Sequence, residues 1–245
     1  MRDVSIIIPA FNRADTIGRA VRSCLVQPCL VEVVIVDDGS TDSTREVIEK
    51  TFRSELQVTA DVRYIAQSNQ GVCAARNRGL LEATGEFVKF LDSDDELVVD
   101  ALGEELRVAR ESKADVVVSA WEERSWGDGH ELIERRRQMP CPVLNRGIDD
   151  MLKGESPWTA AALYRRAFVA CLKWNSDFGK ADDWGWAWTV CLAGARFAMM
   201  DGVSAVYWHH EGERITSVPT AFNDSTVVRQ RILARPRSKS LSSEV

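Results

Sequence analysis

The feature that most constrains the fold is a regular alternation of short apolar runs with helical periodicity over residues 1–120. Val4–Ile8 and Val33–Val36 are nearly continuous runs of β-branched residues, which is the pattern of strands buried on both faces. Between them, Ile17–Leu25 carries apolar residues at helical spacing, with Pro28 just beyond its end. Because alternating strands and helices pack as a parallel sheet covered by helices, the sequence predicts an α/β fold.

The alternation continues to residue 119 and then stops. The expected elements are a helix that begins after residue 41, a strand over 62–65, a helix over 71–83, a strand over 86–91, a helix over 98–109 and a strand over 115–119. Beyond Trp121 the pattern is irregular, and only residues 182–194 return to helical spacing. Residues 229–239 carry five basic residues and no acidic one, so we expect 229–245 to be a flexible basic tail.

Carboxylates follow two of the predicted strands directly. Asp37 and Asp38 end the second strand, and Asp92, Asp94 and Asp95 follow the strand over 86–91. In open α/β sheets, ligands bind at the edge where the carboxyl ends of the strands lie. Close carboxylates repel one another unless a cation joins them, and Mg²⁺ or Mn²⁺ with a diphosphate suits such oxygen ligands. Each turn also has an ordinary interpretation, because Asp-Gly is common turn chemistry and Asp95 can cap the next helix.

Composition disfavours several other classes of protein. The chain has 37 acidic and 31 basic side chains and a net charge of −6, which disfavours nonspecific nucleic-acid binding. No stretch without a charged residue exceeds twelve residues, so we expect no membrane span. The six cysteines include no C-x-x-C pair, which favours reduced thiols, and the N-terminus lacks a cleavage site, which favours a cytoplasmic protein. No G-x-G-x-x-G follows the first strand, which disfavours a dinucleotide-dependent dehydrogenase.

Four segments resemble, in order and spacing, the motifs of the family-2 glycosyltransferases. They are VSIIIPAFN at 4–12, VVIVDDGSTDST at 33–44, NQGVCAARNRGL at 69–80 and GEFVKFLDSDDEL at 85–97. The resemblance implies a GT-A-type, Rossmann-like, mostly parallel sheet flanked by helices, with an irregular acceptor-side C-terminal half. It also implies transfer of a sugar from a nucleoside-diphosphate donor, with UDP favoured, to an acceptor hydroxyl with inversion, assisted by Mn²⁺ or Mg²⁺.

On the donor side, the resemblance assigns roles residue by residue. Three residues after the first strand line the nucleoside pocket, two aspartates after the second bind the base, and an arginine of the third helix contacts phosphate. The residues concerned are Pro9, Ala10, Phe11, Asp37, Asp38, Arg76, Asp92 and Ser93, with Asp92 near the ribose, Asp94 on the metal and Asp95 in support. Two alternatives remain open: one of Asp37 and Asp38 caps the turn, and Arg76 is an ordinary solvated arginine.

On the acceptor side, Ala181-Asp182-Asp183-Trp184 resembles the family's acidic pair and aromatic residue at the start of a helix, although the family commonly has Glu-Asp there. We predict that Asp183 is the catalytic base, kept ionised by the helix dipole, with Asp182 and Trp184 in support. Asp182 is the alternative base, or an N-cap. Val206–His210 resembles a late Tyr-x-x-His element, so His210 is a candidate metal or diphosphate ligand, or a structural hydrogen-bonding residue.

Together these inferences divide the chain into a nucleotide-sugar-binding half at 1–120, an acceptor and catalytic-base half of the same domain at 121–228, and the tail at 229–245. The expected activity is a transferase of glycan or polysaccharide biosynthesis. Its acceptor would be a saccharide or a lipid-linked saccharide, and Trp158 and Trp184 are candidates for acceptor contact. The alternative is a nucleotide-sugar-binding subunit without turnover. We expect a cytoplasmic protein whose tail is either solvated or in peripheral contact with the inner face of a membrane.

Overall fold

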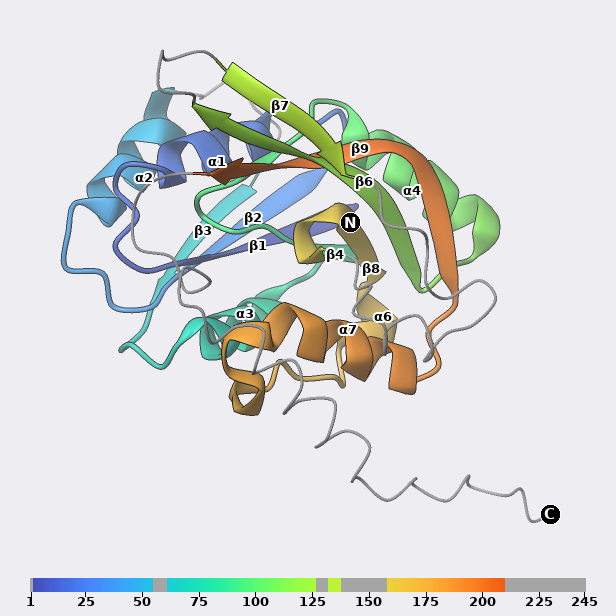
Figure 1. The fold of residues 1–245 in the computed structure, drawn as a ribbon. Helices are drawn as coiled ribbons and strands as arrows, with labels where there is room; N and C mark the ends of the chain where they lie inside the picture. Colours follow the sequence, from blue (N-terminus) through green and yellow to red (C-terminus); the bar gives the residue numbers. More distant parts are fainter. Residues whose placement is uncertain (1, 55–60, 127–131, 138–157, 210–245) are drawn as a thin grey trace.

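The computed structural model describes residues 2–54, 61–126, 132–137 and 158–209 (Figure 1). A single sheet runs through these residues, with helices on both faces (Figure 1). In chain order the elements are β1 (Val4–Ala10), α1 (Ile17–Leu25), β2 (Val31–Asp37), α2 (Thr44–Ser54), β3 (Asp61–Ala66), α3 (Val72–Glu82), β4 (Phe87–Phe90), β5 (Glu96–Leu97), α4 (Ala101–Ser112), β6 (Val116–Trp126), β7 (Leu132–Arg137), η1 (Thr159–Ala161), β8 (Ala162–Arg165), α6 (Arg166–Val169), η2 (Ser176–Ala181), α7 (Asp182–Leu192) and β9 (Phe197–His209).

Strands β1 to β4 form one parallel part of the sheet, in the order β3-β2-β1-β4. Every residue of β1, β2 and β4 is buried, as expected for central strands covered on both faces. One core contains residues of α1, α2 and α4, and the other contains residues of α3 and α7. The α/β fold and the first four predicted strands are therefore confirmed.

The second half contributes more strand than the sequence predicts. β6 continues to Trp126, well beyond the predicted strand at 115–119, and pairs with β9 in parallel and with β8 antiparallel. β8 also pairs with β4, so strands from both halves of the chain share one sheet. The extension of β6 escaped prediction because Glu122, Glu123 and Arg124 interrupt the apolar alternation, and Glu122 and Arg124 form an ion pair.

Two helices bear on the predicted site. α7 coincides with the helical spacing expected over 182–194. α4 begins at Ala101, three residues later than expected, because Glu96 and Leu97 instead form β5 and pair with β9. Asp95 therefore does not cap α4; its buried carboxylate accepts a hydrogen bond from the backbone N of Trp208, at 2.9 Å. No helix in the described ranges is long and apolar enough to cross a membrane.

A buried ion pair lies where β4, α4, β6 and β9 meet. The side chains of Lys89 and Glu105 are both 0% exposed, and Nζ of Lys89 lies 2.8 Å from each carboxylate oxygen of Glu105. Oγ of Ser119 donates to Glu105 at 3.1 Å, and Ser204 lies within hydrogen-bond distance of Lys89. Two charges without access to water are tolerated only as a pair, so each depends on the other.

Replacing one partner of this pair should destabilise the fold strongly. We expect Lys89→Met to lower the free energy of unfolding by about 3 to 5 kcal/mol, because it leaves the Glu105 carboxylate buried without a counter-charge. The double variant Lys89→Met/Glu105→Leu should recover most of that loss. Urea unfolding measures both, and Arg107→Met, which breaks an exposed pair with Glu104, is the control with little effect. A single variant no less stable than this control would contradict the account.

Candidate active site

The donor-side residues lie at the carboxyl ends of β1, β2 and β4. Pro9 and Ala10 end β1 and are buried, whereas Phe11 directly after it is 43% exposed. An exposed aromatic ring beside a sheet edge offers a face for stacking. The structure therefore leaves Phe11 accessible where the sequence predicts the nucleoside pocket.

The two aspartates after β2 already have protein partners. Asp37 accepts a hydrogen bond from the backbone N of Ser40 at 2.8 Å and another from the Tyr64 hydroxyl, so Asp37 caps its turn, as one alternative held. The carboxylate of Asp38 is buried and receives three hydrogen bonds from the loop before α3: two from side-chain and backbone groups of Gln67 and Gln70, and one from the backbone N of Gly71. Asp38 thus shapes the loop that leads into α3, and its contact with a base stays a prediction.

Arg76, on α3, is the centre of a charged cluster. Its side chain is 4% exposed, so it is not a solvated surface arginine. Nη2 lies 2.8 Å from Oδ1 of Asp92, and Nη1 lies 2.6 Å from Oδ2 of Asp182 and 3.2 Å from Oδ1 of Asp183. One guanidinium therefore joins the acidic turn after β4 to the acidic pair at the start of α7. We call the four residues Arg76, Asp92, Asp182 and Asp183 the Arg76 cluster. The cluster joins residues predicted to bind the donor with residues predicted to act on the acceptor.

Aromatic rings support the Arg76 cluster from one side. The guanidinium carbon of Arg76 lies 4.2 Å from the centre of the Trp174 ring, a cation–π contact. Trp174 is stacked on Trp186 of α7, with ring centres 4.7 Å apart, and both rings contact Phe90 of β4. Trp174 was missed in the sequence analysis, because it lies in an irregular segment with no periodicity to mark it.

Asp183 lies in the first turn of α7, where its carboxylate is recessed but still reached by water, with 35% of the side chain exposed. Desolvation by the surrounding protein raises the pKa of Asp183 to about 7; Asp182 and Asp92 add to the rise, and Arg76 opposes it. A pKa near 7 leaves this carboxylate partly protonated at neutral pH, against the expectation of a carboxylate kept ionised by the helix dipole, because burial and like charges favour the protonated form. A general base with a pKa near neutral pH suits proton transfer well.

Asp182 precedes Asp183 on α7, and its side chain is turned inward. Its Oδ1 accepts a hydrogen bond from the backbone N of Asp183 at 3.0 Å, and its Oδ2 is bound to Arg76. Both oxygens are therefore engaged, whereas in the part of the chain that the structure describes, the contacts of the Asp183 carboxylate go to one oxygen. Trp184, next along the helix, packs edge-on against Trp188 at 5.6 Å.

The three carboxylates of the acidic turn after β4 each contact a different part of the protein. Asp92 binds Arg76, Asp95 binds the backbone of β9, and Asp94 lies 4.0 Å from Nε of Arg13 with 21% of its side chain exposed. Ser93 between them is buried. Arg19 of α1 holds the turn by donating to the carbonyl oxygen of Asp94 at 2.6 Å. The three carboxylates thus do not converge on one point, contrary to the expectation from their spacing.

The arrangement of possible metal ligands bears on the predicted divalent-cation site. In the described part of the chain, no group of three or more His, Cys, Asp or Glu side chains is placed to hold a metal ion. His210 lies outside the described residues. Mg²⁺ and Mn²⁺ are commonly held by one or two carboxylates together with the oxygens of a bound phosphate. The partly exposed carboxylate of Asp94 fits a site in which the protein and a bound phosphate share the cation, and it does not fit a site made of protein ligands alone.

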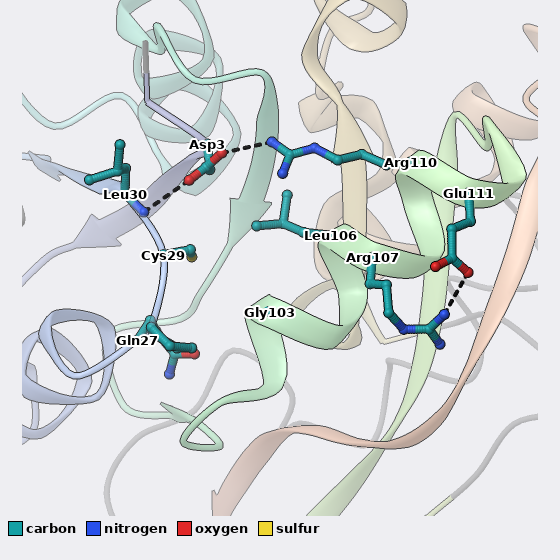
Figure 2. Close-up of a pocket in the computed structure, with 10 residues that line it drawn as sticks. Asp3, Gln27, Cys29, Leu30, Gly103, Leu106, Arg107, Arg110 and Glu111 are labelled. Atoms are coloured by element: carbon teal, nitrogen blue, oxygen red, sulfur yellow. Dashed lines mark hydrogen bonds and ion pairs between the residues drawn. The ribbon is translucent and has the colours of Figure 1, made fainter.

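A separate pocket lies away from the carboxyl ends of the strands and has a different set of lining residues. It has a volume of about 770 Å³ and lies between the start of β1, the loop after α1, and α4. Figure 2 shows Asp3, Cys29, Leu106 and Arg110 around it, with Arg110 bound to Asp3. Because it contains none of the predicted site residues and opens near the amino end of β1, we assign it no part in the reaction.

Comparisons with known proteins agree with this arrangement. The family model described as glycosyl transferase family 2 matches residues 5–173. The chain is 27% identical over 189 residues to the GalNAc(5)-diNAcBac-PP-undecaprenol beta-1,3-glucosyltransferase of Campylobacter jejuni, covering 73% of this chain and 56% of that protein. It is 33% identical over 174 residues to the uncharacterized glycosyltransferase YibD of Escherichia coli, covering 68% and 49% respectively. The chain thus spans about half the length of these two relatives.

Solved structures share the fold. TarS of S. aureus (residues 1–349) in complex with UDP-GlcNAc superimposes with a TM-score of 0.72 at 25% identity, covering 96% of this chain and 68% of that one. The mannosyltransferase PcManGT of Pyrobaculum calidifontis, in complex with GDP-Man and Mn²⁺, gives a TM-score of 0.62 at 19% identity, covering 87% and 60%. With the GT-A-type fold and a family model that matches more than half of the sequence, the chain belongs to glycosyl transferase family 2.

Proposed function

We propose that this glycosyltransferase moves a sugar from a UDP-sugar to a hydroxyl group of a saccharide or lipid-linked saccharide, with inversion, and that Asp183 is its general base. The observation that carries the proposal is the Asp183 carboxylate, which is recessed, partly open to water and, within the described ranges, bound through one oxygen. UDP as the nucleotide is supported by the UDP-GlcNAc complex of TarS. A lipid-linked acceptor is supported by the name of the Campylobacter jejuni relative.

The proposed step is a single displacement. Asp183 takes the proton of the acceptor hydroxyl as its oxygen forms a bond to C1 of the donor sugar. The bond from C1 to the diphosphate oxygen breaks, and its electron pair leaves with UDP. Attack from the face opposite the leaving group inverts C1. A carboxylate whose pKa is about 7 is ionised in a large share of molecules at neutral pH, so it can accept the proton.

The donor would be held at the carboxyl ends of β1, β2 and β4. Phe11 would stack on the base, Asp92 would lie near the ribose, and Asp94 would bind a divalent cation shared with the diphosphate. When bound, Mn²⁺ or Mg²⁺ neutralises negative charge on the leaving diphosphate. Arg13, whose guanidinium lies 4.0 Å from Asp94, adds positive charge at the same place.

The acceptor would approach from the side of Trp158. This ring packs edge-on against Tyr207 at 5.4 Å and lies 6.1 Å from Trp121, and Trp158 immediately precedes the residue that contacts Asp183. The apolar face of a sugar ring packs well on such rings. The basic tail at 229–245 lies outside the described residues, so membrane contact through it and a location at the inner face of the membrane stay proposals.

Replacing the base should abolish most turnover and spare donor binding. We expect Asp183→Asn to slow UDP release from UDP-GlcNAc, or from the best donor of a UDP-sugar panel, by about 10² to 10⁴-fold. Its affinity for UDP should change little. In the parent, the rate should rise with pH through about 7, because Asp183 is protonated and inactive below its pKa.

Two controls make that result specific. Asp201→Asn changes an exposed aspartate of β9 and should leave the rate unchanged. Asp182→Asn tests whether the neighbouring aspartate is the base instead. Loss of activity in Asp182→Asn together with full activity in Asp183→Asn would make Asp182 the base. A parent protein that binds UDP but releases none from any donor would instead support a binding subunit without turnover.

Metal-dependent donor binding should depend on Asp94. We expect Mn²⁺ to strengthen UDP binding to the parent, and we expect Asp94→Asn to lose most of that gain, because Asp94 is the partly exposed carboxylate at the predicted diphosphate position. Titration calorimetry with and without Mn²⁺ measures both affinities. Binding without metal is the internal control for an intact pocket. An equal gain from Mn²⁺ in both proteins would show that Asp94 does not hold the cation.

A further inference from the structure

The carboxylate of Asp183 is held asymmetrically. Oγ1 of Thr159 donates a hydrogen bond to its Oδ1 at 3.0 Å, and Nη1 of Arg76 approaches the same oxygen at 3.2 Å. Among the described residues, both contacts that the structure gives this carboxylate go to Oδ1. Oδ2 is therefore the oxygen left for a substrate, on a side chain that is 35% exposed.

Thr159 is fixed in place by the sheet. It is 3% exposed and opens η1, the short turn that leads into β8 between β4 and β6. The turn is closed by a backbone hydrogen bond from Ala161 to Trp158 at 2.9 Å, and the carbonyl oxygen of Ala161 also accepts from Ser119 of β6 at 2.9 Å. A buried threonine on so constrained a backbone holds its hydroxyl in one position, so the direction of its hydrogen bond is fixed.

Arg76 alone does not hold Asp183 in this orientation. Its Nη1 is shared between two carboxylates and lies closer to Asp182, at 2.6 Å, than to Asp183, at 3.2 Å. The Thr159 hydroxyl is the donor that Asp183 does not share with Asp182. Because an ionised carboxylate only accepts hydrogen bonds, the Thr159 hydroxyl must donate to it.

We infer that Thr159 is a positioning residue of the reaction, which holds Oδ1 of Asp183 so that Oδ2 faces the acceptor hydroxyl. The inference rests on the proposed role of Asp183 as base. During the step, the acceptor proton moves to Oδ2, while Oδ1 keeps its hydrogen bond from Thr159 before and after the transfer. The hydroxyl of Thr159 neither gains nor loses a proton.

The test removes the hydroxyl while keeping the shape of the side chain. We expect Thr159→Val to lower kcat for UDP release by about 10 to 100-fold, the range for a lost hydrogen bond to a charged group, with little change in the KM for donor. The pH midpoint of the rate should move upward, because a donor that favours the ionised form is gone. Thr159→Ser keeps a hydroxyl and should restore both values. Thr189→Val, which removes a hydroxyl bound within α7, is the matched control and should behave as the parent.

A second measurement is independent of turnover. The pKa of Asp183 can be read by carbon-13 NMR of its carboxyl group, with the signal assigned by its loss in Asp183→Asn. We expect this pKa to be higher in Thr159→Val than in the parent, and to return in Thr159→Ser. If Thr159→Val does not fold, Thr159→Ala, which is smaller and also lacks the hydroxyl, takes its place.

The outcomes separate the inference from the proposed function. An unchanged kcat, pH midpoint and Asp183 pKa in folded Thr159→Val would overturn the role of Thr159. Equal rates of UDP release in the parent and Asp183→Asn would overturn the proposed base, and with it the positioning role. A loss of kcat that Thr159→Ser does not restore would show that Thr159 acts through packing, which also overturns the inference.

Discussion

The rest of the site depends on one buried guanidinium. Arg76 lies between an acidic turn 16 residues later in the chain and an acidic pair 106 residues later, and it contacts both within hydrogen-bond distance. Three carboxylates share this single positive charge, which leaves two negative charges uncompensated when all are ionised. Burial raises the pKa of both Asp92 and Asp183, and the neighbouring negative charges raise it further. Such an excess of negative charge would be costly in a purely structural cluster, and it suits the proposed role of Asp183 as proton acceptor.

The fold fixes the positions of the side chains in the Arg76 cluster. Arg76 of α3 pairs with Asp92 just after β4, and its guanidinium lies over the ring of Trp174. Trp174 in turn stacks on Trp186 of α7. The turn before β8 places the hydroxyl of Thr159 against Asp183, the proposed base. Three separate segments therefore fix the orientation of one carboxylate, and the donor edge and the proposed base cannot move independently. A displacement reaction requires that coupling, because nucleophile, C1 and leaving group must lie in line.

How far the sequence predicts this arrangement depends on the range of the interactions. β1 and β2 follow from their buried β-branched runs, β4 follows from its short apolar run, and α7 follows from its spacing, because these signals are local. The carboxylates at the strand ends were found for the same reason. The partners of Arg76 could not be predicted, since neither spacing nor composition shows that a residue of α3 meets the start of α7. Thr159 lies 24 residues before Asp183 in a segment without periodicity. The charged extension of β6 is a strand because β7 and β9 pair with it on either side.

The central claim is that Asp92 and Asp182 belong to one electrostatic unit through Arg76. A double-mutant cycle of Asp92→Asn and Asp182→Asn, measured as free energies of unfolding in urea, tests it directly. The account predicts that the two effects do not add, with a coupling energy of about 0.5 to 3 kcal/mol, because each carboxylate alters the balance of charge on the other. The control cycle pairs Asp92→Asn with Asp115→Asn, whose carboxylate binds Arg196 instead, and should be additive within about 0.5 kcal/mol. Additivity in both cycles would contradict the claim that Arg76 joins the two sides of the site.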